Sequence, residues 1–108
     1  MDVFYRPELG GIIVENVTAD GGLSDTFDGR LMNPGHAIEA MWFIMDLGKR
    51  LNRNDLIEKA VKTTLTMIEY GWDQKYGGIF YFMDRLEYPP QQLEWDQKLW
   101  WVHIETLI

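Results

Sequence analysis

Residues 35–51, GHAIEAMWFIMDLGKRL, decide the fold of this chain, because apolar side chains fall on every side of the helix that they predict. A helix that is apolar all round should be covered on both sides. His36 and Glu39 are three residues apart at its start and lie on one face of it. Buried ionisable groups are costly unless they are paired or used. His36 is therefore either a satisfied core histidine or part of a site.

Residues 55–70, DLIEKAVKTTLTMIEY, predict a second and different helix. Apolar residues recur in it at helical spacing, and charged residues face away from them. These apolar residues are Ile57, Val61, Leu65 and Ile68. Asn54 is the predicted N-cap, and Gly71 is the predicted residue just beyond the last turn. An apolar helix followed closely by an amphipathic one predicts an inner helix paired with an outer helix.

Less regular sequence lies on both sides of this helical pair. Residues 1–34 are rich in glycine and predict a long loop or hairpin, with GIIVENV at 11–17 as a candidate strand. The segment IFYFMD at 79–84 has strand composition, and the two prolines of residues 85–92 predict a loop. Residues 93–108, LEWDQKLWWVHIETLI, predict a further and largely apolar helix.

The two apolar helices begin with related sequences. HAIEAM at 36–41 resembles HIETL at 103–107, and the Ile-Glu pairs within them are 66 residues apart. This spacing suits a helix–loop–helix unit of a toroid or solenoid, which cannot bury its faces alone. The chain also stops inside the last predicted helix, without a capping residue. We therefore expect residues 1–108 to be an internal piece of a larger α-helical protein.

Composition argues against several classes of protein. A net charge of −7 argues against binding to nucleic acid, whose phosphates need clustered lysine and arginine. The absence of cysteine excludes disulfides and fits a reducing compartment. No apolar run reaches the roughly 18–20 residues that span a bilayer, and the first residues lack a signal-peptide pattern. We expect a cytoplasmic protein with no membrane partner, and with its five tryptophans mainly in the core.

The residues that could carry chemistry gather at the starts of the two apolar helices. His36 is accompanied there by Glu39, and His103 by Glu105. Histidine exchanges protons near neutral pH, and a neighbouring carboxylate can fix its tautomer or raise its basicity. A metal site is disfavoured, because no third ligand is evident.

Other conspicuous residues favour structural roles. The Gly-Gly pairs at 10–11, 21–22 and 77–78 lack the lysine and hydroxyl residue of a phosphate-binding loop, and they predict turns with positive φ. Trp100 and Trp101 would point about 100° apart on a helix, so at most one of them can face a common cavity. Glu94 and Lys98 are predicted to form an ion pair near a helix end.

Three segments together resemble the N-acylglucosamine 2-epimerase family, which includes the renin-binding proteins. They are GRLMNPGHAIEAMWFI at 29–44, GWDQKYGGIFYFMD at 71–84 and QLEWDQKLWWVHIE at 92–105. The segments are specific, lie in the family's order and cover most of residues 29–108. The chain is more similar to the N-acetylglucosamine branch than to the cellobiose 2-epimerase branch, in which a glutamine is usual in place of His103.

The resemblance implies an all-α fold, a segment of an (α/α)6 barrel with a short β-hairpin insertion, in which residues 1–108 form a partial domain. It implies a sugar isomerase that interconverts N-acetyl-D-glucosamine and N-acetyl-D-mannosamine by removing and returning a proton at C2, without a cofactor. His36 takes an acid/base role, and a second histidine belongs to a later motif that this chain does not contain. Glu105 matches an essential glutamate and would face His36 across one wall. The implied substrate contacts are Arg30, Glu39, Trp101 and His103.

The length departs from the family, because a barrel of twelve helices needs several hundred residues and this chain supplies about three helices and a hairpin. We expect the chain alone to be incomplete and inactive as an epimerase, and to associate with itself or with missing parts through its apolar surface. Two alternatives to an N-acylhexosamine epimerase stay open. One is a non-catalytic protein-interaction module of the same fold, and the other is a 2-epimerase that acts on unmodified aldoses or disaccharides.

Overall fold

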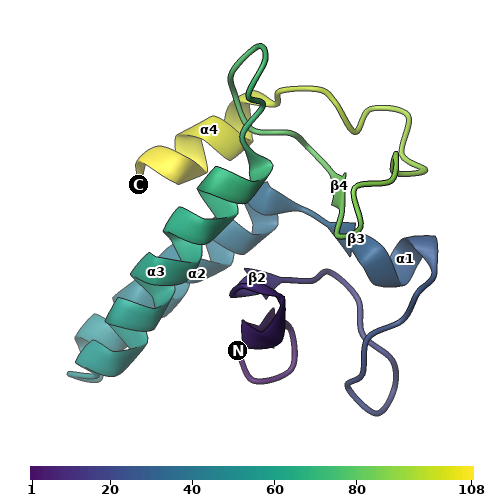
Figure 1. Ribbon diagram of the computed structural model, residues 1–108. Coiled ribbons are helices and arrows are strands. Elements are labelled where there is room, and N and C mark those ends of the chain that lie inside the picture. Colours follow the sequence, from purple (N-terminus) through teal and green to yellow (C-terminus); the bar gives the residue numbers. More distant parts are fainter.

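The centre of the molecule is a pair of long helices, α2 (Pro34–Arg50) and α3 (Asn54–Gly71). The structure, a computed structural model, describes all 108 residues, and α2 and α3 lie side by side in it, joined by a tight connection (Figure 1). Asn33 starts α2, because its side-chain Oδ1 accepts a hydrogen bond from the His36 backbone N–H at 3.1 Å. Pro34 then occupies the first helical position, where a missing N–H costs nothing. Both helices predicted from the sequence are confirmed.

The ends of α3 differ from the prediction by one residue each. Arg53, and not Asn54, is the N-cap, because the Arg53 carbonyl already accepts from the N–H groups of Leu56 and Ile57. Gly71 is the last helical residue and does not have positive φ. A Cβ at Gly71 would lie 2.8 Å from Cβ of Pro34, so glycine is needed here for the close approach of the two helices.

The face that α3 buries differs in part from the predicted one, since Ile68 packs against the core and Ile57 is partly buried, as predicted, but the other two members of the stripe are exposed. Its buried residues are Ala60, Thr63, Met67 and Gly71. Val61 and Leu65, members of the predicted apolar stripe, are 42% and 63% exposed. Ala60, Thr63 and Gly71 are small and let α3 approach α2 closely, while Met67 fills the core.

The expectation that α2 is covered on all sides is also wrong within this chain. Ala37, Ile38 and Met41 are buried against neighbouring elements. Phe43 and Leu47, in contrast, are 54% and 44% exposed. Other elements of this chain cover one side of α2, and the side that carries Phe43 and Leu47 is exposed.

The strands are short and form two separate ladders. β1 (Tyr5–Arg6) and β2 (Ile12–Ile13) pair as an antiparallel hairpin around a single 3-10 turn, η1 (Pro7–Leu9). The candidate strand at 11–17 is thus reduced to two residues.

The second ladder joins distant parts of the sequence. β3 (Leu31–Met32) follows the short helix α1 (Phe27–Arg30) and pairs with β4 (Met83–Asp84). The strand predicted at 79–84 is therefore present only at its end, beside an isolated bridge between Trp72 and Ile79 that closes a hairpin-like turn.

The last helix, α4 (Trp100–Leu107), begins well after the predicted start at residue 93. The residues before α4 form turns, because their carbonyl groups bond to another segment of the chain. The Trp95 carbonyl accepts from the Phe82 N–H, and the Gln97 carbonyl accepts from the Tyr81 N–H. The predicted ion pair of Lys98 with Glu94 is also wrong. Lys98 instead binds Asp73, with Nζ 2.9 Å from Oδ2.

One hydrophobic core holds these elements together, and α4 packs against α2 near one end of the helical pair (Figure 1). Its buried members come from β2, β3, the helices α2, α3 and α4, and the turn at 79, and they are Ile12, Met32, Ala37, Ile38, Met67, Ile79 and Val102. No tryptophan is fully buried and Trp101 alone packs against the core, so the expectation of five tryptophans mainly in the core is wrong for the other four. The chain is mostly helical, as a segment of a helical fold should be, and the closed barrel stays a prediction. None of its helices combines the length and the apolar character needed to cross a membrane.

Candidate active site

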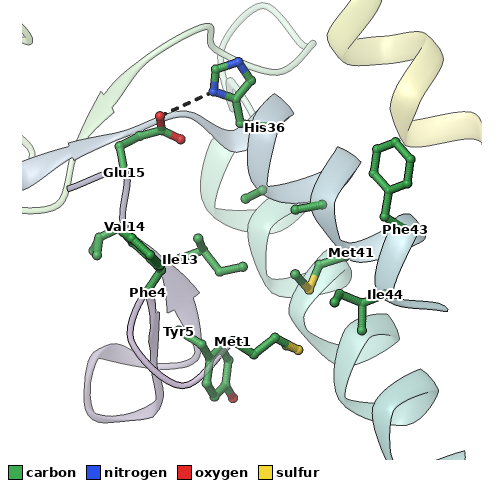
Figure 2. Close-up of a pocket in the computed structure, with 12 residues that line it drawn as sticks. Met1, Phe4, Tyr5, Ile13, Val14, Glu15, His36, Met41, Phe43 and Ile44 are labelled. Carbon is green, nitrogen blue, oxygen red and sulfur yellow. Dashed lines mark hydrogen bonds and ion pairs between the residues drawn. The ribbon is translucent and has the colours of Figure 1, made fainter. Parts of the chain in front are cut away.

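His36 lies in the first turn of α2 with its side chain 54% exposed. Its Nδ1 lies 3.3 Å from Oε2 of Glu15, a carboxylate that follows β2 in the sequence (Figure 2). The ring also contacts the indole of Trp101 on α4, with 5.5 Å between ring centroids and 34° between planes. His36 is thus an accessible histidine in contact with a carboxylate and an aromatic ring, and the alternative of a buried core histidine is excluded.

A pocket of about 480 Å³ opens beside this histidine, between the N-terminal hairpin and α2. Figure 2 shows Glu15 and His36 together at one end of it, above walls that are almost entirely apolar. The aromatic and aliphatic wall residues include Phe4, Tyr5, Ile13, Met41, Phe43 and Ile44. The polar chemistry of the pocket is therefore concentrated at the Glu15–His36 end.

Trp101 occupies the junction between α2 and α4. Besides His36, its ring meets Tyr81 edge-on, with 6.3 Å between centroids and 86° between planes. Gly35 makes this approach feasible, because a Cβ there would lie 2.8 Å from Cη2 of Trp101 and 2.7 Å from Cγ2 of Val102. Trp100 is 77% exposed, which confirms that the two neighbouring tryptophans diverge.

Glu105 lies farther along the contact between α4 and α2. Its Oε2 accepts a hydrogen bond from Nε1–H of Trp42 at 2.7 Å. His36 and Glu105 therefore belong to the same pair of helices, but each binds a different partner, and no hydrogen bond joins them. Their opposition across one wall of a barrel stays a prediction.

Both ring nitrogens of His103 are engaged by the backbone. Nε2 accepts from the Ile79 N–H at 3.0 Å, and Nδ1 lies 2.7 Å from the Leu99 carbonyl oxygen. Because a nitrogen that accepts cannot carry a proton, the network assigns the hydrogen to Nδ1. Through these two hydrogen bonds His103 connects the turn after α3 to the start of α4. A contact of His103 with substrate stays a prediction.

Arg30 is buried, with 8% exposure, and its guanidinium binds protein groups. Nε donates to Oδ2 of buried Asp84 at 2.9 Å, and Nη1 donates to the Asp25 carbonyl at 2.6 Å. The hydrogen bond with Asp84 raises the pKa of Arg30 above its already high value. The rings of Phe27 and Tyr88 lie 4.9 and 5.1 Å from the guanidinium carbon. Arg30 therefore joins α1 to β4, and its substrate contact stays a prediction.

Glu39 lies one turn after His36 on α2 and is partly exposed, so its assigned substrate contact also stays a prediction. No three His, Asp or Glu side chains gather closely enough to hold a metal ion. The Gly-Gly pairs form turns, as predicted, with positive φ at Gly10, Gly11, Gly21, Gly77 and Gly78.

Three contributors to the site were not found from the sequence: Glu15, Trp42 and Asn33. No sequence pattern indicated Glu15, because β2 ends at Ile13 and the consecutive residues Ile13, Val14 and Glu15 all line the pocket. The Asn-Pro pair before α2 carried the signal for the cap at Asn33. Nothing in the sequence indicates that Trp42 binds Glu105, since 63 residues separate them.

Fold and site together define a helical segment that presents an accessible histidine between a carboxylate and an aromatic ring. The sequence model of the N-acylglucosamine 2-epimerase (GlcNAc 2-epimerase) family matches residues 10–108, and the chain belongs to this family. The rat N-acylglucosamine 2-epimerase (Rattus norvegicus) is 41% identical to it over 100 residues, and the bovine protein of that name (Bos taurus) is 42% identical over 103 residues. Each similarity covers 92% of this chain and 24% of the relative. The human protein (Homo sapiens) is 40% identical over 100 residues. The chain thus spans about a quarter of the length of the curated relatives that it matches.

Proposed function

We propose that this chain carries part of the active site of a 2-epimerase that interconverts N-acetyl-D-glucosamine and N-acetyl-D-mannosamine. The relatives named N-acylglucosamine 2-epimerase support the substrate class. The observation that carries the proposal is His36 itself: it is accessible, it binds Glu15 through Nδ1, and its Nε2 has no protein partner. A base with one free nitrogen is what proton removal from carbon requires.

In the proposed reaction, Nε2 of His36 removes the proton from C2 of the open-chain sugar, next to the carbonyl group. The electrons of the C–H bond move toward the carbonyl oxygen and give an enediolate-like intermediate. Return of a proton to the opposite face of C2 inverts that carbon. The second acid/base group is expected from the later family motif, because the chain's other histidine is engaged through both nitrogens.

The surroundings of His36 support this chemistry. The Trp101 ring provides a flat apolar surface against which the C–H face of a sugar can pack. Glu105 is fixed by Trp42 and contributes a negative charge near the junction of α2 and α4. The net charge of −7 favours an uncharged polyol over a phosphorylated sugar. Removal and return of the C2 proton leave the oxidation state of the sugar unchanged, so the proposed reaction needs no redox cofactor.

A test separates proton exchange from inversion. One base can remove the C2 proton and return a deuteron from D2O to the same face, whereas epimerisation needs a group on the other face. We therefore expect slow loss of the C2–H proton NMR signal of N-acetyl-D-mannosamine with this chain, without build-up of the second epimer. The rat relative provides the positive control for both processes.

His36→Ala should abolish the exchange, and Glu58→Ala, on the exposed side of α3, should leave it unchanged. The ring signals of His36 and Trp101 should also shift when the sugar is added. Absence of both His36-dependent exchange and these shifts would overturn the proposal and favour the non-catalytic interaction module. Exchange with unmodified mannose but not with N-acetylmannosamine would instead favour an epimerase of plain aldoses.

A further inference from the structure

We propose that Glu15 is a positioning residue for His36, holding the imidazole in the tautomer with hydrogen on Nδ1 so that Nε2 is the proton acceptor. The proposal deepens the function proposed above, and only its effect on turnover depends on that function. It assigns a role to a residue far from His36 in the sequence, in a segment with no helical pattern.

The first support is the hydrogen bond itself. An ionised carboxylate only accepts hydrogen bonds, so the 3.3 Å contact between Oε2 of Glu15 and Nδ1 of His36 places the ring hydrogen on Nδ1. The Glu15 side chain is 25% exposed, so water competes with this contact less than at an open surface. Figure 2 shows Nε2 pointing away from Glu15.

The second support is that the same short segment anchors both partners. The Glu15 N–H donates to the Leu31 carbonyl at 3.2 Å, and the His36 N–H donates to Oδ1 of Asn33 at 3.1 Å. Val14, directly before Glu15, is 1% exposed, and its N–H donates to the Phe4 carbonyl. The backbones of Glu15 and His36 are thus held in a fixed relation by residues 31–33.

The third support is a second contact of the imidazole ring, with Trp101. The indole of Trp101 lies against the imidazole at a centroid distance of 5.5 Å. A ring held at Nδ1 by a carboxylate and along one face by an indole has little freedom to rotate. Because the free nitrogen must meet the C2 proton at hydrogen-bond distance, such restriction favours proton transfer.

The tautomer can be measured on this chain without any turnover. Long-range proton–nitrogen correlation spectra of the ¹⁵N-labelled chain distinguish a protonated Nδ1 from a protonated Nε2. We expect the Nδ1–H form for His36 and also for His103, whose Nδ1 faces the Leu99 carbonyl. Glu15→Ala should convert His36 to a mixture of tautomers and leave the His103 signals unchanged, which makes His103 an internal control for folding.

A conservative variant separates orientation from charge. In Glu15→Gln the amide oxygen can still accept from Nδ1–H, but the amide N–H can also donate to Nδ1, so the Nδ1–H tautomer should be retained only in part while the negative charge is lost. Observation of His36 as the Nε2–H form in the unmodified chain would overturn the proposal. Unchanged His36 signals in Glu15→Ala would overturn it equally.

Turnover provides the second readout. In the C2–H exchange assay with N-acetyl-D-mannosamine, Glu15→Ala should lower kcat at least roughly tenfold, with KM within about twofold. Glu15→Gln should recover part of this loss, and Glu58→Ala should show none of it. An unchanged kcat in Glu15→Ala would overturn the positioning role. If neither the unmodified chain nor any variant exchanges the proton, and the sugar shifts the ring signals of neither His36 nor Trp101, the proposed function fails, and the tautomer measurement still decides the role of Glu15.

Discussion

The indole Nε1–H of Trp42 donates to Oε2 of Glu105 over 2.7 Å and thereby joins α2 to α4. The two residues are 63 positions apart in the sequence, and both are partly buried. A hydrogen bond to an ionised carboxylate is stronger than one between neutral groups, and it also fixes the direction of the carboxylate. Trp42 therefore sets the orientation of Glu105, the glutamate that the family resemblance predicts to be essential.

Trp42→Phe should lower the free energy of unfolding by roughly 1–2 kcal/mol, because Phe keeps an aromatic ring but cannot donate to Glu105. Urea unfolding followed by circular dichroism measures this loss. Trp72→Phe is the matched control, since Trp72 is 44% exposed and forms no side-chain hydrogen bond. Equal effects of the two substitutions would show that the Glu105 contact contributes nothing to stability.

His103→Ala should destabilise the chain by about 1–3 kcal/mol, because the Ile79 N–H and the Leu99 carbonyl both lose their partner. Ile79 is 1% exposed, so water cannot easily replace the ring. His103→Gln should recover much of the loss, since an amide side chain can both accept and donate. Hydrogen exchange at the Ile79 amide is the direct readout, and unchanged protection in His103→Ala would contradict this account.

Gly35→Ala should destabilise the chain by about 1–3 kcal/mol through overpacking at the junction of α2 and α4. The added Cβ would lie within 3 Å of side-chain atoms of both Trp101 and Val102. Helix propensity alone favours alanine over glycine by about 1 kcal/mol, so the two effects have opposite signs. A net loss of thermal stability, together with a changed tryptophan fluorescence spectrum, is the expected result. A net gain would mean that α4 can move away freely.

The stability of the chain should decline in acid partly through Asp73. A hydrogen bond from the Lys98 ammonium, followed by bonds from the Lys75 and Tyr76 N–H groups, lowers the pKa of Asp73 below 3.8, although burial opposes this shift. A carboxylate with a lowered pKa in the folded state contributes stability above its unfolded pKa. That contribution is lost as the pH falls through the folded pKa, below about pH 4.

Asp73→Asn should therefore lower the melting temperature at pH 7 and flatten its dependence on pH between roughly pH 5 and pH 2. Thermal unfolding at a series of pH values measures both effects. Asp2→Asn, at an exposed position near the start of the chain, serves as the control. Parallel curves for Asp73→Asn and the unmodified chain would show that Asp73 does not carry this acid sensitivity.

Local periodicity predicted α2 and α3 well, because apolar spacing and flanking turn residues determine a helix within its own sequence. Periodicity predicted part of the buried face of α3 wrongly, because the distance between α2 and α3 decides whether Ala60 or Val61 is buried. It also failed for residues 93–99, whose composition suits a helix. There the carbonyls of Trp95 and Gln97 bond to residues 81 and 82, a pairing that only the tertiary structure reveals.

The candidate site was predictable to a similar extent. His36 was found because a histidine at the start of an apolar helix is conspicuous in the sequence. Its partner Glu15 was missed, because the contact spans 21 residues between a hairpin and a helix. Sequence pattern thus identified the group that can carry a proton, and the groups that orient it required the three-dimensional structure.

The distances in sequence between the site's partners have a consequence for how the site forms during folding. α2 and α3 are neighbours in sequence, so their pairing closes only a short loop and can form early. The pair of Trp42 with Glu105, and that of Arg30 with Asp84, close loops of more than fifty residues. We therefore expect the pair of α2 and α3 to form during folding before the contacts that complete the candidate site. Slowed docking of α4 would then delay the appearance of the site without preventing collapse of the chain.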